Sequence, residues 1–474
     1  MSPGEPVNTQ QPLDPHGLGR VHFIGMGGAG MSAVARLLLA RGVAVSGSDA
    51  KDSAGLRQLE ALGATVFVGQ SAANVADAAT VVVSTAIKET NLELAAARAA
   101  GARILHRSQA LAAAMHGRNV IAVAGTHGKT TTSSMAAVAL QAAGMDPSWA
   151  VGAHVPDLGA NAGFGSGDWF VAEADESDGS FLTYHPRIAI ITNVEPDHLD
   201  HYGSAQAFYA AFDEFCDTIR PSGTLVACAD DPGSEQLARR RRDRGEAALT
   251  YGQNPAADVV VSDATPHGTG SSCTLTFDRD GARRTVALTL AVPGAHNVAD
   301  AAAAFTAGLA AGADPDLLAE GLGSFHGSSR RFDPKGEDGG VRVFDDYAHH
   351  PTEVAAALTA ARDVAQGHRV LAVFQPHLYS RTREFAEAFC RALEIADLAC
   401  VTDVFGAREE PQPGITGAAI TGHASDDRVV STPSAEEAIE TVVARARPGD
   451  VIMTIGAGDV TALGPRILSA LAQR

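Results

Sequence analysis

The sequence is short of the residues that crosslink a fold. Its 474 residues include five cysteines, at positions 216, 228, 273, 390 and 400, and no two of them form a C-x-x-C pair. An odd and scattered set of this kind is not the pattern of a disulfide framework or of a structural zinc site. We therefore expect buried thiols in a reducing compartment, and the cytoplasm as the location.

Long apolar runs are also missing. No uncharged apolar stretch reaches the roughly 18 residues that a membrane-spanning helix needs, so we expect no membrane insertion. The opening MSPGEPVNTQQPLDPHGLG has no apolar core either. It therefore does not have the pattern of a signal peptide, and we predict a disordered tail over residues 1–19.

Positive charge is scarce as well. Lys and Arg total 36 against 55 Asp and Glu, which gives a formal net charge of −19. An acidic surface argues against nucleic acid or an anionic membrane as the main partner, but it leaves room for local basic pockets that bind small phosphorylated ligands. The 45% of hydrophobic residues is enough for packed cores, and the length allows roughly two to four domains.

Predicted strands alternate with predicted helices along the whole chain, which indicates an α/β fold built on parallel sheets. Three such units follow one another. We predict an N-terminal Rossmann-like domain over residues 20–117, a central P-loop-type ATPase sheet over 118–331 and a C-terminal Rossmann-like domain over 332–474. The segment after RPSGTLVACADDP is expected to be poor in strands, and RRRRDR, at 239–244, is expected to be a solvated helix face.

The first glycine loop is GMGGAG, residues 25–30, which fits G-x-G-x-x-G between a predicted strand and a predicted helix. Its glycines let the backbone approach a diphosphate, and the helix N-terminus favours the negative charge. Asp49, at the end of the next predicted strand, is placed to accept hydrogen bonds from ribose hydroxyls. The loop predicts a nucleotide-diphosphate site but does not distinguish NAD from a UDP-sugar, and a purely structural glycine turn is the alternative.

The second glycine loop is VAGTHGKTTT, residues 123–132, which matches the P-loop except that Val123 stands where the first glycine would be. A predicted strand precedes it and a predicted amphipathic helix follows. The N–H groups of residues 126–130 are expected to form an anion nest. Lys129 is expected to reach the β- and γ-phosphates, and the Thr130 hydroxyl to bind Mg²⁺. A dehydrogenase would need only the first loop.

Four polar stretches follow, VAEADESDGSF, TNVEPDHLDHYG, DDYAHHPTE and FQPHLYSRTREF. A carboxylate at a strand end beside a P-loop suits Mg²⁺, although most acids of the first stretch are expected to be surface groups or helix caps. The second stretch is either a solvated loop or a ligand-binding strand end. In the fourth, Arg381 and Arg383 favour carboxylate or phosphate recognition, with a surface salt bridge as the alternative.

These motifs, together with PGAHN and RRFD, occur in the order found in the Mur ligases, and the sequence resembles that family from about Val21 to Gly458. The resemblance implies an ATP- and Mg²⁺-dependent amide ligase of peptidoglycan and cell-wall synthesis, hence of cell shape and division. The first domain would hold the UDP-sugar, the central domain would hold Mg-ATP, and the third domain would hold the amino acid. The motifs are most similar to those of the member that joins L-alanine to the lactyl carboxylate of UDP-N-acetylmuramate through an acyl phosphate. The alternative is the recycling member that joins a whole tripeptide. A monomer or weak homodimer is expected.

The resemblance also implies roles for individual residues. The catalytic residues would be Lys129, Glu173, His198, His349 and Arg381. Thr130, Glu173 and His198 would hold Mg²⁺. The nucleotide would be bound by Gly125, Thr126, His127, Gly128, Lys129, Thr130, Thr131, Asn297, Arg331, Asp346 and His350. The other substrates would be bound by Gly27, Gly28, Ala29, Gly30, Asp49, Asn193, Tyr347 and His377.

Three positions depart from the patterns of relatives. Phe212 stands where later Mur ligases carry a carbamylated, metal-binding lysine, which favours the alanine-adding member. Leu378 replaces an arginine common at that position, so that anion recognition there rests on Arg381 or Arg383. Arg408 stands where relatives often have glycine, and the role of its loop stays open.

Overall fold

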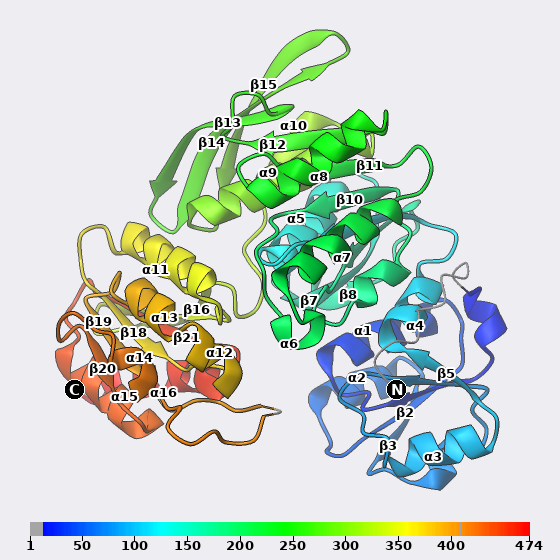
Figure 1. The fold of residues 1–474 in the computed structure, drawn as a ribbon, viewed down its shortest axis with the longest axis horizontal. Coiled ribbons are helices and arrows are strands. Elements are labelled where there is room, and N and C mark those ends of the chain that lie inside the picture. Colours follow the sequence, from blue (N-terminus) through cyan, green and yellow to red (C-terminus); the bar gives the residue numbers. More distant parts are fainter. Residues whose placement is uncertain (1–12, 408) are drawn as a thin grey trace. The chain divides into compact units, whose positions relative to one another are not determined.

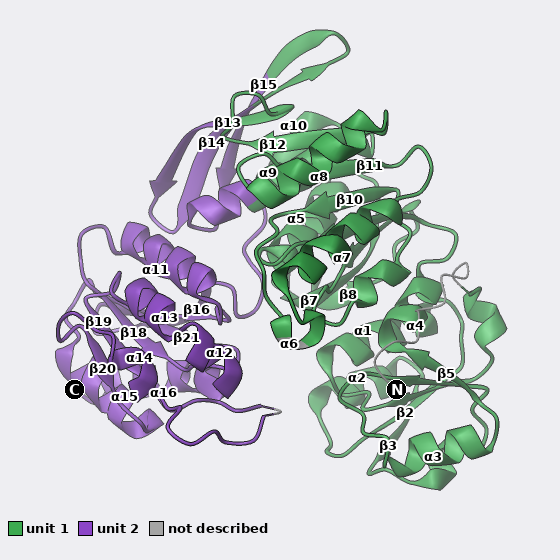
Figure 2. Ribbon diagram, in the orientation of Figure 1, with its two compact units in different colours: residues 1–260, 276–284, 300–322 green, residues 261–275, 285–299, 323–474 purple. Residues whose placement is uncertain are grey.

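The computed structural model describes residues 13–407 and 409–474, and these residues form three β-sheets with helices packed against them (Figure 1). The chain divides into two compact units (Figure 2). Unit 1 comprises residues 1–260, 276–284 and 300–322, and unit 2 comprises residues 261–275, 285–299 and 323–474. No helix in the described ranges is both long and apolar enough to cross a membrane. All five cysteines are free and buried.

The first sheet is parallel, with the strand order β3-β2-β1-β4-β5. Its strands are β1 (Val21–Ile24), β2 (Val45–Asp49), β3 (Thr65–Val68), β4 (Thr80–Val83) and β5 (Arg103–His106). The helices are α1 (Ala29–Ala40), α2 (Ala54–Ala61), α3 (Leu92–Ala99) and α4 (Arg107–Ala114), with short 3-10 turns η1 (Pro15–Leu18) and η2 (Ala72–Val75). The strand order reverses between β1 and β4, so the glycine loop after β1 lies where ligands bind in such sheets.

The second sheet has the order β15-β14-β13-β12-β11-β10-β6-β9-β7-β8. The strands are β6 (Asn119–Ala124), β7 (Ser148–Val155), β8 (Ala160–Gly163), β9 (Trp169–Glu173), β10 (Ile188–Ile191), β11 (Thr224–Cys228), β12 (Ala248–Gly252), β13 (Val259–His267), β14 (Gly270–Arg279) and β15 (Ala282–Leu290). The helical elements are α5 (Lys129–Ala142), α6 (Leu199–Tyr202), α7 (Ala205–Asp217), α8 (Pro232–Asp243), α9 (Ala295–Ala310), α10 (Pro315–Gly323), η3 (Pro156–Leu158) and η4 (Ser180–Thr183). β6 lies between β10 and β9, and it carries the P-loop at its carboxyl end.

The third sheet has the order β16-β17-β21-β18-β19-β20 and is parallel except for β16. Its strands are β16 (Asp333–Asp338), β17 (Val341–Asp346), β18 (Val370–Phe374), β19 (Leu398–Val401), β20 (Val429–Ser431) and β21 (Val451–Ile455). The helical elements are α11 (Pro351–Ala365), α12 (Tyr379–Glu384), α13 (Ala386–Leu393), α14 (Ala418–Thr421), α15 (Ala435–Arg445), η5 (Asp459–Ala462) and α16 (Leu463–Leu471). One apolar cluster joins the sheet to α11 and α13, and a second joins it to α15 and α16. Three α/β sheets, as the sequence predicted, are therefore confirmed.

The stretch expected to be poor in strands is the clearest error. Four strands, β12 to β15, lie between Ala248 and Leu290, after the stretch RPSGTLVACADDP, which itself contains β11. β14 and β15 are joined by Asp280 and Gly281, both with positive φ. A two-residue Asp-Gly loop of that conformation is a strong hairpin signal, and β15 alternates exposed and buried positions, so this part of the sequence did carry a strand pattern.

Two helical faces also differ from expectation. Every residue of α5 from Thr130 to Leu140 is buried, so this helix is enclosed rather than amphipathic. In the arginine run of α8, Arg241 points inward and is only 4% exposed, because its guanidinium donates to the Cys216 carbonyl at the end of α7. The run is therefore not a uniformly solvated face.

The tail predicted over 1–19 falls mainly on residues 1–12, which lie outside the described residues, as does Arg408. Residues 15–18 form η1 instead of a disordered segment, and Leu18 is buried against the first sheet. Phe212 is fully buried and packs against Phe181 and Phe208 at centroid distances of 5.4 and 5.1 Å, so it belongs to an aromatic cluster of the core.

Candidate active site

The P-loop connects β6 to α5, and its glycines are required by both conformation and space. Gly128, the N-cap of α5, has φ +82°, and a Cβ there would lie 2.5 Å from Asp300 Oδ1. The first intrahelical bond runs from Thr132 N to Gly128 O, so the N–H groups of residues 128–131 precede it. Those groups form the start of a helix, where phosphate binds well.

The expected nest over residues 126–130 is wrong at two positions. Thr126 N donates to Asn193 O, and His127 N donates to Asn193 Oδ1 at 2.9 Å. Asn193 Nδ2 in turn donates to the His127 carbonyl. Asn193, predicted as a substrate residue, therefore braces the P-loop. Sequence reasoning missed this because the two segments meet only through the pairing of β6 with β10.

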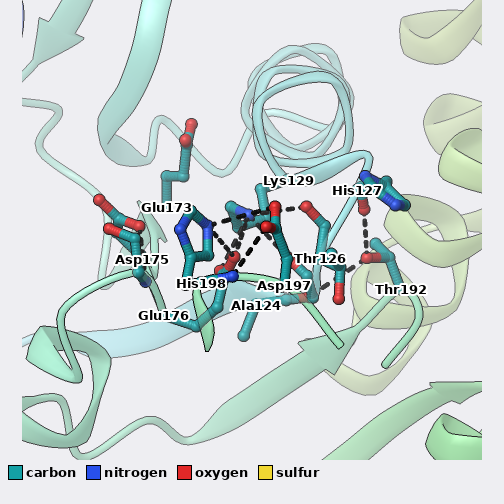
Figure 3. Close-up of polar contacts among 12 residues, drawn as sticks. Ala124, Thr126, His127, Lys129, Glu173, Asp175, Glu176, Thr192, Asp197 and His198 are labelled. Atoms are coloured by element: carbon teal, nitrogen blue, oxygen red, sulfur yellow. Dashed lines mark hydrogen bonds and ion pairs between the residues drawn. The ribbon is translucent and has the colours of Figure 1, made fainter. Parts of the chain in front are cut away.

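Lys129 is held inside the site by oxygen atoms. Its Nζ donates to Gly125 O at 2.7 Å, to Thr126 O at 3.0 Å and to Glu176 Oε1 at 2.9 Å. Burial alone would lower the pKa of Lys129, but the nearby charges of Glu176 and Asp175 outweigh it and raise that pKa. Lys129 is therefore a charged group close to the start of α5 (Figure 3).

Glu176 is a buried acid of the site that sequence reasoning did not separate from the other acids of its stretch. It is fully buried, and burial raises its pKa to about 7 although Lys129 lies 2.8 Å away. Its backbone carbonyl accepts a hydrogen bond from the Tyr202 hydroxyl. No local signal in EADESD separates this acid from its neighbours, because its burial depends on packing against distant elements.

The expected metal ligands lie on neighbouring elements. Thr130 Oγ1 donates to Glu173 Oε1 at 3.1 Å, and Gly152 N donates to Glu173 Oε2 at 2.7 Å. His198 has φ +54°, and its Nε2 lies 3.7 Å from Glu176 Oε1 and 3.6 Å from Asp197 Oδ2. Figure 3 shows Glu173, His198 and Lys129 gathered beside the start of α5. Thr130 and Glu173 are in direct contact, and His198 lies beside Glu176, the partner of Lys129.

The first glycine loop is braced by the acid predicted to bind ribose. Gly27 N donates to Asp49 Oδ2 at 2.9 Å, so one carboxylate oxygen already supports the loop. Gly28 is the N-cap of α1 and supplies no side-chain oxygen. Ala29 and Gly30 form the first turn of that helix, which contains no acidic residue. The turn is therefore suited to an anion.

The remaining predicted residues lie in unit 2. The Tyr347 ring packs under the guanidinium groups of Arg330 and Arg331, whose Cζ atoms lie 4.8 and 5.0 Å from its centroid. The rings of His349 and His377 lie 6.1 Å apart. These side chains, which come from three separate motifs, are thus brought together within unit 2.

The other four predicted residues of unit 2 have defined environments of their own. Asp346 accepts from Phe332 N and Ala348 N, and burial raises its pKa to about 6. His350 is the N-cap of α11, and Asn297 Nδ2 donates to the Pro293 carbonyl at 2.6 Å. Arg381 is buried on α12. Leu378, which replaces a common arginine, has φ +70°, a conformation that is costly for a branched residue.

Comparisons with known families match the three parts of the chain in order. Residues 20–119 match the Mur ligase family catalytic domain, residues 123–308 the Mur ligase middle domain, and residues 330–458 the Mur ligase glutamate ligase domain. The UDP-N-acetylmuramate–L-alanine ligase of Renibacterium salmoninarum is 55% identical over 456 residues, which cover 96% of each chain.

Two solved structures are similar over nearly the full length. The UDP-N-acetylmuramate-alanine ligase of Thermotoga maritima has a TM-score of 0.78 at 28% identity and covers 95% of this chain and 98% of its own. The murein peptide ligase of Psychrobacter arcticus has a TM-score of 0.69 at 26% identity and covers 96% of this chain and 99% of its own.

Proposed function

The chain belongs to the Mur ligase family, and from this membership and the site we propose that it joins L-alanine to the lactyl carboxylate of UDP-N-acetylmuramate at the expense of ATP. The observation that carries the proposal is the cluster of Lys129, Thr130 and Glu173 at the P-loop, in the same unit as a second glycine loop. Such a ligase needs one loop for a nucleoside triphosphate and one for a sugar nucleotide.

The reaction proceeds in two displacements. The lactyl carboxylate oxygen attacks the γ-phosphorus of ATP, the bond to the β-phosphate oxygen breaks, and an acyl phosphate and ADP form. The amine of L-alanine then attacks the acyl carbon, loses a proton and expels phosphate. Positioning and charge neutralisation supply most of the catalysis in such steps. Lys129 and the N–H groups at the start of α5 supply both to the phosphates.

Mg²⁺ is part of the proposal. The oxygen donors of Thr130 and Glu173, whose atoms lie 3.1 Å apart beside the P-loop, fit this hard cation, and His198 is the further candidate ligand. When bound, the cation would neutralise charge that develops on the phosphates. The amino-acid side of the reaction is assigned to Tyr347, His349, His377 and Arg381. The nucleotide side includes Asn297, Arg331, Asp346 and His350.

The domain roles and the setting complete the proposal. Residues 20–117 bind the UDP-sugar, 118–331 bind ATP, and 332–474 bind the amino acid and close the site. The five buried free thiols support a reducing cytoplasm as the location. A monomer or weak homodimer is proposed as the assembly.

The test is release of inorganic phosphate from Mg-ATP and UDP-N-acetylmuramate, with either L-alanine or the L-alanyl-D-glutamyl-diaminopimelate tripeptide as acceptor. Release that depends on both the sugar nucleotide and L-alanine is expected. Release only with the tripeptide would assign the chain to the recycling reaction of murein peptide ligases. No release with either acceptor would contradict the ligase assignment.

A further inference from the structure

Arg107 lies directly on the first turn of α1. It is the first residue of α4, and that position is fixed by a capping box in which His106 N donates to Gln109 Oε1 at 2.8 Å. A Cβ at Gly30 would lie 2.3 Å from Arg107 Nη1 and 3.1 Å from its Cδ. The guanidinium is therefore packed against the glycine loop, and a larger residue at Gly30 would displace it.

The N–H groups of the Arg107 guanidinium are not used in hydrogen bonds within the described part of the chain. Its contact with an acid is Asp175 Oδ2 at 3.6 Å, which is too long for a hydrogen bond. The side chain is 31% exposed and makes no hydrogen bond to any other described residue. Two other arginines of the same region differ, because Arg41 donates to Ala114 O and His116 O, and Arg118 donates to Gly165 O. Those two hold backbone in place, whereas Arg107 does not.

We propose that Arg107 is a substrate-binding residue whose guanidinium takes the diphosphate of the UDP-sugar against the first turn of α1. The inference rests on the proposed function and adds a residue to its sugar-nucleotide site. A planar guanidinium offers paired donors that match phosphate oxygens, and the N–H groups of residues 29–31 precede the first intrahelical bond of α1 in the same turn. The absence of any acid in that turn removes a competitor for the cation.

The position of Arg107 also links the sugar nucleotide to the ATP side of unit 1. Asp175 belongs to the loop that carries Glu176, the partner of Lys129. The start of α1 is tied to the second sheet as well, because Asn161 Nδ2 donates to Ala29 O at 3.0 Å. A diphosphate that engages Arg107 therefore competes with Asp175 for the same guanidinium.

Isothermal titration of UDP, UDP-N-acetylglucosamine and UDP-N-acetylmuramate into wild type, Arg107→Ala and Arg107→Lys tests the proposal. We expect Arg107→Ala to weaken all three ligands by about tenfold to a hundredfold, with Arg107→Lys in between. Arg98→Ala is the matched control, since Arg98 is an exposed arginine of the same domain paired with Glu89. It should bind all three like wild type. Steady-state kinetics of Arg107→Ala should show a higher KM for UDP-N-acetylmuramate and an unchanged KM for ATP.

Comparing the three ligands across wild type and the variants separates the possible outcomes. Weaker binding of UDP-N-acetylmuramate alone would place Arg107 at the lactyl carboxylate and overturn the diphosphate assignment. Unchanged binding of all three by Arg107→Ala would overturn the proposal while the ligase function stands. Wild-type protein that binds none of them would overturn the proposed function together with this inference. Circular dichroism and the melting temperature of each variant establish that it is folded, and Arg107→Lys serves as the reporter if the alanine variant is not.

Discussion

Lys129 is at once the expected phosphate ligand and the counter-ion of a buried acid. Its Nζ lies 2.8 Å from Glu176 Oε2, and Glu176 has no exposed surface. A phosphate that reaches Lys129 therefore competes with Glu176 for the same ammonium group. Removal of the lysine alone would leave a buried carboxylate uncompensated, which is costly in a folded protein.

Lys129→Ala is expected to abolish phosphate release and to leave UDP-N-acetylmuramate binding nearly intact. It should also lower the free energy of unfolding by about 3 kcal/mol. The double variant Lys129→Ala with Glu176→Gln removes the stranded charge, so it should regain most of that stability and none of the activity. Phosphate release, titration of the sugar nucleotide and urea unfolding measure the three effects. A folded Lys129→Ala variant that no longer binds the sugar nucleotide would contradict the assignment of ATP to the P-loop and of the UDP-sugar to the first glycine loop.

Asp346 makes the stability of its unit depend on pH. Burial raises its pKa to about 6, compared with an ordinary value of 3.8, so the folded state keeps its proton at pH values where the unfolded chain has lost it. The stabilising contribution is therefore complete below pH 3.8 and is lost as the pH rises through about 6. The loss amounts to about 3 kcal/mol for a shift of roughly two pKa units.

Asp346→Asn removes this dependence. The amide cannot accept from both Phe332 N and Ala348 N, so the variant should have a lower free energy of unfolding than wild type. This difference in the free energy of unfolding should shrink as the pH rises from about 4 to about 6, because the wild type loses its stabilising contribution over that range. Urea unfolding of both proteins at a series of pH values gives that difference. A difference that grows with pH would show that the two backbone donors outweigh burial and depress the pKa of Asp346.

At the scale of elements, one arginine in a run of four fixes how α8 packs on α7. Arg241 Nη1 donates to Cys216 O at 2.8 Å and lies 3.0 Å from Glu246, whereas the Arg239 side chain is 70% exposed. Arg241→Ala removes this buried, charge-assisted hydrogen bond, although Ile219 N still donates to Cys216 O, and it should lower the free energy of unfolding by about 1–3 kcal/mol. Arg239→Ala, which removes the same charge from the same helix, should change it by no more than about 0.5 kcal/mol. Equal urea midpoints for the two variants would contradict this role.

The elements that were predicted correctly share a local signal. The strands β1, β6, β9, β10, β18 and β21 are compact and mostly apolar runs, because both faces of a parallel sheet are covered. A glycine follows β1, β6 and β21, and β9 ends in Glu173. The hairpin of β14 and β15 was missed because exposed and buried residues alternate along β15, so that it contains no continuous apolar run. The inward turn of Arg241 could not be read from RRRRDR, since it depends on the end of another helix.

In the site, too, the features that are contiguous in sequence could be predicted and those that depend on long-range packing could not. The P-loop could be predicted because strand, glycines, Lys129 and Thr130 are contiguous in the chain. The braces around it could not, because Asn193 and Glu176 reach their partners through sheet pairing and packing between distant segments, and the position of Arg107 beside Gly30 depends on such packing as well. Sequence spacing also placed the N–H groups of Thr126 and His127 in the anion nest, although both donate to Asn193 in the structure.

At the scale of the whole molecule, both glycine loops belong to unit 1 and each follows a strand at the carboxyl edge of its own sheet. The first begins α1 and the second begins α5. The two loops proposed to bind phosphate therefore belong to one unit, while the residues assigned to the amino acid, and four assigned to the nucleotide side, belong to the other. Ligands that bind one at a time should consequently stabilise different stretches of backbone.

Hydrogen exchange of the full chain tests this separation. UDP-N-acetylmuramate alone should slow exchange in residues 21–49 and 103–114, and a non-hydrolysable ATP analogue alone should slow it in residues 119–142. A ligand at about 100 times its Kd stabilises the bound state by about 2.7 kcal/mol, so amides that exchange only through opening of the site should slow up to about a hundredfold. The strands β18 and β21 of unit 2 are the internal control for the sugar nucleotide and should exchange at an unchanged rate. Protection by the sugar nucleotide in those strands, with none in residues 21–49, would place its site in unit 2 and contradict the assignment of the first glycine loop.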